Sequence, residues 1–132
     1  MSLCRVDLHR SPTYKYLLER HKARFPRIEN DLGDSFWVDI ARDYRNARQA
    51  ESVPGFKNTI FKYRAKCSDM RRGARGGYRV IAYYHLPENT LFPLLLYHKS
   101  DQDDTSAEIV QQAIDELLGL LGIPKFPDPT SK

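Results

Sequence analysis

The feature that most constrains the fold is a change in the spacing of apolar residues near residue 59. Before that point apolar side chains recur at the spacing of amphipathic helices. Over residues 59–67 apolar and basic side chains alternate instead, which is typical of a strand with one buried face. Helices followed by consecutive strands favour the α+β class.

Two helices are predicted in the first part of the chain. Ser11 and Pro12 suit the N-cap and first position of a helix, and apolar spacing continues from there. A second helix is predicted over residues 28–48, with Gly33 in its interior, where glycine costs about 1 kcal/mol relative to alanine. A short alternation over Leu3–Leu8 predicts a first strand.

Three strands and a final helix are predicted afterwards, over residues 59–67, 78–85, 91–98 and 105–121. Pro93 lacks a backbone N–H, which favours a sheet edge or a bulge at that residue. Thr105-Ser106-Ala107-Glu108 matches a capping box. We therefore expect one domain over residues 1–132: a small antiparallel sheet with two N-terminal helices and one C-terminal helix, covered on one face and partly open on the other.

Composition excludes several classes of protein. The two cysteines, Cys4 and Cys67, form no CxxC pattern, which argues against a zinc ribbon, a redox pair or a secreted disulfide scaffold. The first ten residues carry charges and lack the apolar segment of a signal peptide, and no apolar run approaches the length of a membrane span. We expect a reduced cytoplasmic protein that needs neither metal nor membrane.

Charge is distributed unevenly along the chain. Residues 57–79 hold eight basic residues and one acid, whereas residues 101–116 hold six acids and no Lys or Arg. Lys62, Arg64 and Lys66 alternate with apolar residues, so they share the outer face of their strand, and a hairpin can place Arg79 beside them. Like charges facing each other across strands repel, which favours a polyanionic ligand such as RNA. The alternative is a solvated basic face without a ligand.

Other motifs point to no specific site. Residues 73–81 are rich in glycine, but they lack the P-loop pattern and precede a strand rather than a helix. His85 and His98 lie at strand ends, where an imidazole can transfer protons near neutral pH or serve a purely structural role. No HExxH or ligand cluster predicts a metal site.

Three segments carry a family resemblance: FKYRAK at residues 61–66, RGGYRVIAYY at residues 75–84 and LLLYHKSD at residues 94–101. Together they resemble the RelE-type toxins of bacterial type II toxin–antitoxin modules, in particular the RelE/HigB-like branch. The resemblance covers residues 57–110, and the predicted order of elements agrees with the RelE-like fold over nearly all of the chain.

The resemblance implies an mRNA endoribonuclease that acts on the ribosome without metal or cofactor, by attack of a ribose 2′-OH on the adjacent phosphate. It implies five catalytic positions: Lys62, Arg64, Arg79, Lys99 and, as an alternative acid, His98. Arg64 cannot act as a base because its guanidinium stays protonated. The expected RNA contacts are Lys57, Lys66, Arg71, Arg72, Arg75 and Tyr83.

The resemblance also implies partners, namely mRNA, the ribosome and a cognate antitoxin protein, in the bacterial cytoplasm. Two other functions remain open at this stage. One is a ParE-like toxin that poisons DNA gyrase. The other is a relative that binds RNA or an antitoxin without catalysis.

Overall fold

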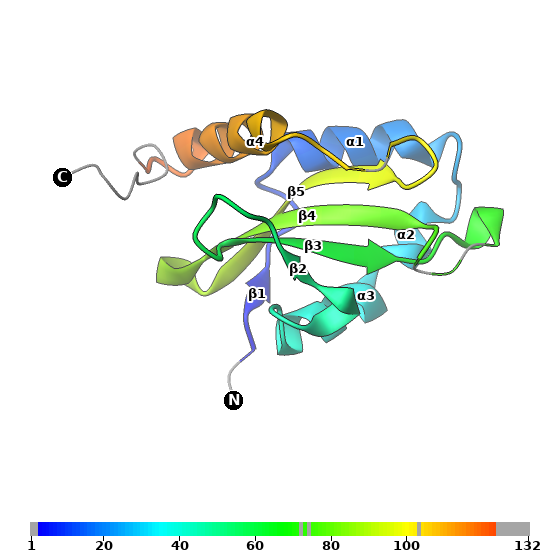
Figure 1. The fold of residues 1–132 in the computed structure, drawn as a ribbon, viewed down its shortest axis with the longest axis horizontal. Helices are drawn as coiled ribbons and strands as arrows, with labels where there is room; N and C mark the ends of the chain where they lie inside the picture. The colour runs from blue at the N-terminus through cyan, green and yellow to red at the C-terminus, as the bar shows by residue number, and fades with distance from the viewer. Residues whose placement is uncertain (1–2, 72, 74, 103, 124–132) are drawn as a thin grey trace.

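The structure is a computed structural model that describes residues 3–71, 73, 75–102 and 104–123. It has the predicted α+β architecture (Figure 1), built on a five-stranded mixed sheet of order β1-β5-β4-β3-β2. The strands are β1 (Arg5–Val6), β2 (Glu51–Ser52), β3 (Ile60–Ala65), β4 (Tyr78–His85) and β5 (Thr90–His98). The helices are α1 (Pro12–Lys22), α2 (Ile28–Asp31), α3 (Asp34–Arg42) and α4 (Ala107–Leu120).

The central strands β3, β4 and β5 pair antiparallel, as predicted. The prediction of a wholly antiparallel sheet is wrong, because β1 pairs parallel to β5 and the backbone N–H of Arg5 donates to the oxygen of Asn89 at 2.9 Å. The sequence reading also missed β2, which extends the other edge. The predicted irregularity at Pro93 is confirmed as a bulge: Pro93 pairs with Ala82 beside a register shift.

The second predicted helix is interrupted at Gly33. The chain forms α2, then Gly33 serves as the N-cap of α3, and α3 ends at Arg42 rather than near residue 48. A side chain at position 33 could not be accommodated, since a Cβ there would lie 2.7 Å from the backbone oxygen of Glu29. The glycine therefore permits a tight corner between two short helices instead of lying inside one long helix.

Helices cover both faces of the sheet, which corrects the expectation of a single covered face. Trp37 and Ile40 of α3 pack with Tyr63 in one core, whereas Val110 and Ile114 of α4 pack in a second core. Because successive strand residues point to opposite faces, one strand contributes side chains to both cores. In Figure 1, α1 and α4 lie together near β5, and α3 lies on the opposite side of the picture.

The start of α4 differs by one residue from the predicted capping box. The N-cap is Ser106 rather than Thr105, and its Oγ accepts a hydrogen bond from the backbone N–H of Ile109 at 3.2 Å. The helix is also held to α1, because Thr13 Oγ1 donates to Glu116 Oε1 at 2.6 Å. Just before the helix, Oδ1 of Asp104 lies 3.6 Å from Nζ of Lys62 on β3.

Candidate active site

A row of polar side chains crosses one face of the sheet. Arg64 of β3 lies opposite Arg79 of β4, which in turn lies opposite Tyr97 of β5. Lys62 precedes Arg64 by two residues and so points to the same face. The structure thus brings together Lys62, Arg64 and Arg79, as the alternation in the sequence predicts.

Arg79 is the most buried cation of this row, with 4% of its surface exposed. Its Nη2 donates a hydrogen bond to the backbone oxygen of Arg75 at 2.7 Å, and its Nη1 donates to that of Tyr78 at 3.1 Å. Burial lowers the pKa of Arg79, and the positive charge of Arg64 lowers it further. A bound anion would relieve this repulsion between neighbouring strands.

Two carboxylates accompany the cations. Glu51 of β2 lies opposite Lys62, and its Oε1 is 3.2 Å from Nη2 of Arg64. Asp104 Oδ1 lies 3.6 Å from Nζ of Lys62. Partial burial acts to raise the pKa of Asp104, but the backbone N–H of Thr105 and the charge of Lys62 outweigh it and leave the pKa below its usual value. Asp104 is therefore ionised at neutral pH and partly neutralises Lys62.

Tyr97 adds a protonated hydroxyl to the same place. The residue is 5% exposed, and its Oη lies 3.5 Å from Oδ1 of Asp104. Burial, and then the negative charge of Asp104, raise the pKa of Tyr97 to about 12. The phenol therefore keeps its proton at neutral pH and can donate it to a stronger base.

We refer to these six residues as the cationic site: Glu51, Lys62, Arg64, Arg79, Tyr97 and Asp104. The sequence-based assignment missed the two acids and Tyr97. The sequence did contain a signal for Tyr97, because side chains alternate along a strand and Tyr97 therefore points to the opposite face from its neighbour His98. The sequence contained no such signal for the two acids, because Glu51 lies on β2, which was not predicted, and Asp104 lies in a loop.

A cavity of about 270 Å³ opens beside the cationic site. Glu51, Lys62 and Asp104 form its polar side, and Ile81 and Val110 line it from the sheet and from α4. This volume is slightly below the range of about 300–1,000 Å³ that is usual for small-molecule pockets. The cavity therefore suits part of an extended ligand that continues over the surface.

His98 lies on the opposite face from the cationic site. Its side chain is completely buried, with its ring stacked on Phe25 at a centroid distance of 4.8 Å and edge-on to Tyr78 at 5.3 Å. Its Nδ1 lies 2.7 Å from the Oγ of Ser100. The expectation that His98 supplies a catalytic acid is corrected here, because the sheet separates it from Arg79.

The other expected site residues occupy two ends of the sheet. Lys99 follows β5, where its backbone N–H donates to the oxygen of Gly77 at 2.8 Å. The exposed expected RNA contacts near the β3–β4 connection are Lys66, Arg71 and Arg75, and Arg72 falls outside the described residues. We refer to the described cations Lys66, Arg71 and Arg75 as the basic rim, which lies at the end of β3 and β4 where Arg79 donates to the backbone oxygen of Arg75.

Lys57 and Tyr83 lie away from that rim, at the opposite end of β3 and β4. Lys57 is exposed, but Tyr83 is 6% exposed and its Oη lies 2.9 Å from Nδ1 of His85. A ring buried in this way has no open face for base stacking beside the cationic site. The expectation that Tyr83 contacts RNA there is therefore corrected.

Among the described residues, no group of three or more His, Cys, Asp or Glu side chains is arranged to hold a metal ion. In the same residues, no helix has both the length and the apolar character required to cross a bilayer.

Comparison with known proteins finds no matching family model and no matching curated protein. The functional argument therefore depends on the geometry of the cationic site and on the three motifs that carry the family resemblance.

Proposed function

We propose that this protein is the toxin of a type II toxin–antitoxin system with a RelE-like fold, and that it cleaves mRNA without metal. The observation that carries the proposal is the cross-strand pair of Arg64 and Arg79, with Lys62 on the same face and a protonated Tyr97 beside them. Cations gathered at this density favour the binding of a polyanion.

Charge stabilisation is the first task of the proposed chemistry. Attack of the 2′ oxygen on phosphorus adds negative charge to the nonbridging oxygens in the transition state. Arg79 and Arg64 are held by backbone and carboxylate partners, so they need little reorganisation to stabilise that charge. Arg79 is the more effective of the two because it is less exposed to water.

Proton transfer is the second task. Glu51 or Asp104 takes the proton of the 2′-OH while the 2′ oxygen forms its bond to phosphorus. The bond from phosphorus to the 5′ oxygen breaks, and that oxygen receives the phenol proton of Tyr97. The products are a 2′,3′-cyclic phosphate and a 5′-hydroxyl end. In this assignment Tyr97 replaces His98 as the acid, since His98 lies on the other face of the sheet.

The partner of such a toxin is an antitoxin protein, and the cationic site suits an acidic segment of it. Lys62 and Arg64 already pair with carboxylates of the same chain, which indicates how an external carboxylate can be held there. We propose that the antitoxin competes with mRNA for this surface.

The test is a purified bacterial translation reaction with a defined mRNA, in which primer extension maps any cuts. Cuts that appear only with ribosomes and yield 5′-hydroxyl ends support the proposal. Intact mRNA together with reduced supercoiling by purified gyrase supports the ParE-like alternative instead. Binding of RNA without cleavage products supports the other alternative, a relative that binds RNA or an antitoxin without catalysis.

Removing the charge of Asp104 is expected to strengthen RNA binding. In Asp104→Asn, Lys62 loses its carboxylate partner and becomes available to phosphate, so the affinity for a short single-stranded RNA should rise about two- to fivefold. Fluorescence anisotropy at low salt measures the change.

Glu108→Gln is the matched control, because it removes an exposed acid from the first turn of α4 by an equally conservative change. An equal rise in both variants would show that only net charge matters. That result would contradict a specific role for the pair of Lys62 and Asp104.

A further inference from the structure

A second cavity, of about 570 Å³, lies at the other end of β3 and β4. Its volume is within the range of about 300–1,000 Å³ that is usual for small-ligand pockets. Tyr83, which lines it, is four residues along β4 from Arg79, a separation of about 13 Å at the usual rise of a strand. The cavity is therefore distinct from the cationic site.

Tyrosine rings and apolar side chains form much of its lining. Tyr44 and Tyr84 stack on each other with a centroid distance of 4.1 Å and an interplanar angle of 12°. Tyr83 is buried on the opposite face of the sheet from Tyr84, beside Leu118 and Ile123, which supply aliphatic surface. A wall of this composition favours a planar, partly apolar group.

The charged residues of the lining are Arg45 and Lys57, both exposed, and no described lining residue is a carboxylate. Within the described part of the chain, neither cation forms an ion pair. The guanidinium of Arg45 lies 5.6 Å from the centroid of the Tyr44 ring, and its Nε is 3.3 Å from the hydroxyl oxygen. The cavity therefore offers two positive charges to an anionic ligand.

The loop that carries Lys57 adopts an unusual backbone. Lys57 has a φ of 54° and Asn58 a φ of 59°, the left-handed region that lysine rarely occupies. Buried Phe56 and a hydrogen bond from Ser52 Oγ to Asn58 Oδ1, at 3.0 Å, anchor the loop. Left-handed residues of this kind are concentrated at ligand sites, where they orient a side chain.

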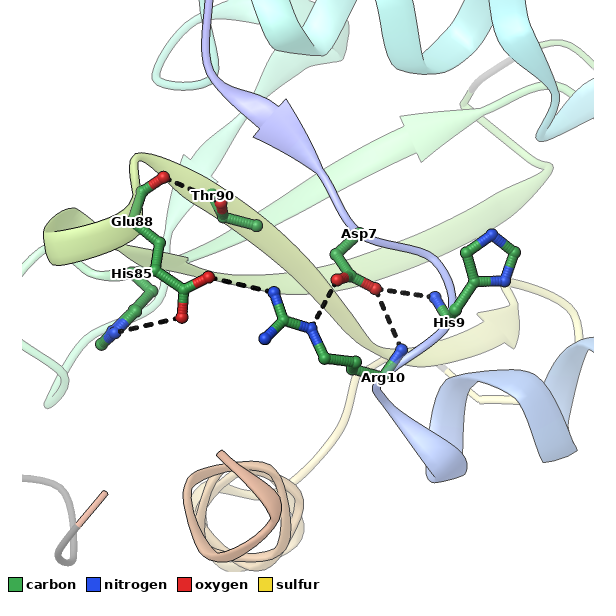
Figure 2. Close-up of polar contacts among 6 residues, drawn as sticks. All are labelled: Asp7, His9, Arg10, His85, Glu88 and Thr90. Atoms are coloured by element: carbon green, nitrogen blue, oxygen red, sulfur yellow. Dashed lines mark hydrogen bonds and ion pairs between the residues drawn. The ribbon is translucent and has the colours of Figure 1, made fainter. Parts of the chain in front are cut away.

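His85 is held in place at the same end of β4, on the face that carries Tyr83. Figure 2 shows Glu88 between His85 and Arg10, with Oε2 at 4.0 Å from His85 Nε2 and Oε1 at 3.0 Å from Arg10 Nη2. Asp7 Oδ2 accepts from Arg10 Nε at 2.6 Å (Figure 2). Tyr83 Oη lies 2.9 Å from His85 Nδ1. This network gives the lining of the cavity a rigid polar group.

We propose that this cavity binds a single nucleotide unit, with the base against the tyrosine wall and the phosphate between Lys57 and Arg45. A nucleotide unit combines the planar ring and the anion that the lining selects, and the side-chain amide of exposed Asn58 supplies a hydrogen-bonding group for the base edge. The unit belongs either to a free nucleoside monophosphate or to a single-stranded RNA. The inference does not rest on the proposed nuclease activity.

The test is a titration of the isotopically labelled full chain, followed by NMR, with AMP, adenosine and inorganic phosphate as separate probes. AMP should shift the amide signals of residues 57–59 and 83–86 and bind at least about tenfold more tightly than adenosine or phosphate, because it engages both the ring wall and the cations. Equal affinity for AMP and adenosine, or shifts confined to the region of Arg79, would overturn the proposal.

Charge removal gives a second, independent readout. Lys57→Gln and Arg45→Gln should each weaken AMP binding about two- to fivefold and leave adenosine binding unchanged. Lys15→Gln removes an exposed cation from α1 and should leave both affinities unchanged. An equal loss in all three variants would show that net charge alone attracts AMP, and it would overturn the site.

The source of the nucleotide is distinguished with a short 2′-O-methyl oligoribonucleotide, which cannot be cut by 2′-OH attack. If the oligonucleotide shifts the amide signals of residues 57–59 and also that of Arg79, the cavity holds a nucleotide of a bound strand. Shifts of residues 57–59 by AMP alone assign it to a free nucleotide. If neither AMP nor the oligonucleotide shifts the amide signals of residues 57–59, nucleotide binding at this cavity is refuted.

Discussion

Arg79→Gln is expected to reduce mRNA cleavage about 100- to 1000-fold. Removing one preorganised group that stabilises transition-state charge has an effect of this size, and Arg79 is the least exposed cation of the cationic site. Glutamine is too short to keep the hydrogen bonds from the guanidinium to the backbone oxygens of Arg75 and Tyr78, but it removes the repulsion with Arg64, which offsets part of that loss. The free energy of unfolding should therefore change by only about 1 kcal/mol.

The measurement is the rate of cleavage in the translation reaction, together with thermal unfolding of the purified variant. Arg42→Gln is the control, since it removes an exposed arginine at the end of α3, on the other side of the sheet. It should cleave at the rate of the unmodified protein. Full cleavage by folded Arg79→Gln would contradict both the site assignment and the proposed mechanism.

Gly77→Ala is expected to lower the free energy of unfolding by about 3 kcal/mol, and the melting temperature by about 10 °C. A Cβ at position 77 would lie 2.1 Å from the backbone oxygen of Ala65 and 2.9 Å from the backbone nitrogen of Cys67. Backbone atoms cannot rotate away as a side chain can. The hydrogen bond from Lys99 N–H to the Gly77 oxygen also holds this segment against β5.

Gly73→Ala is the matched control because it lies in the same connection and, among the described residues, no heavy atom lies within 4 Å of a Cβ placed there. Urea and thermal unfolding of the two variants compare them directly. Equal stability would mean that β3 and β4 do not approach each other at Gly77 as described. Since Arg79 is two residues away, Gly77→Ala should also reduce cleavage by displacing its guanidinium.

The local sequence pattern was sufficient to predict the main elements of the fold. The alternation in residues 59–67 identified β3 and the face that carries Lys62 and Arg64, because strand geometry alone determines which residues share a face. Pro93 likewise predicted a sheet edge or a bulge, since a missing N–H interrupts the hydrogen bonding of a strand, and the structure has a bulge there.

Local pattern failed where contacts made only in the folded chain decided the outcome. Helical spacing continues through Gly33, but the chain forms a corner there in which the backbone oxygen of Glu29 occupies the space that a side chain would need, so only glycine fits. The direction of the two-residue strand β1 depends on the free edge of β5, more than 80 residues away in sequence. Neither contact leaves a periodic signal.

The same division holds for the candidate site. The sequence by itself determined the cations, since alternation placed Lys62 and Arg64 on one face and a hairpin brought Arg79 to them. Only the tertiary structure decided that Glu51 and Asp104 accompany them and that His98 lies on the other face. The reason is physical: periodicity is a property of one strand, whereas partners across a sheet depend on the register and loops that bring distant segments together.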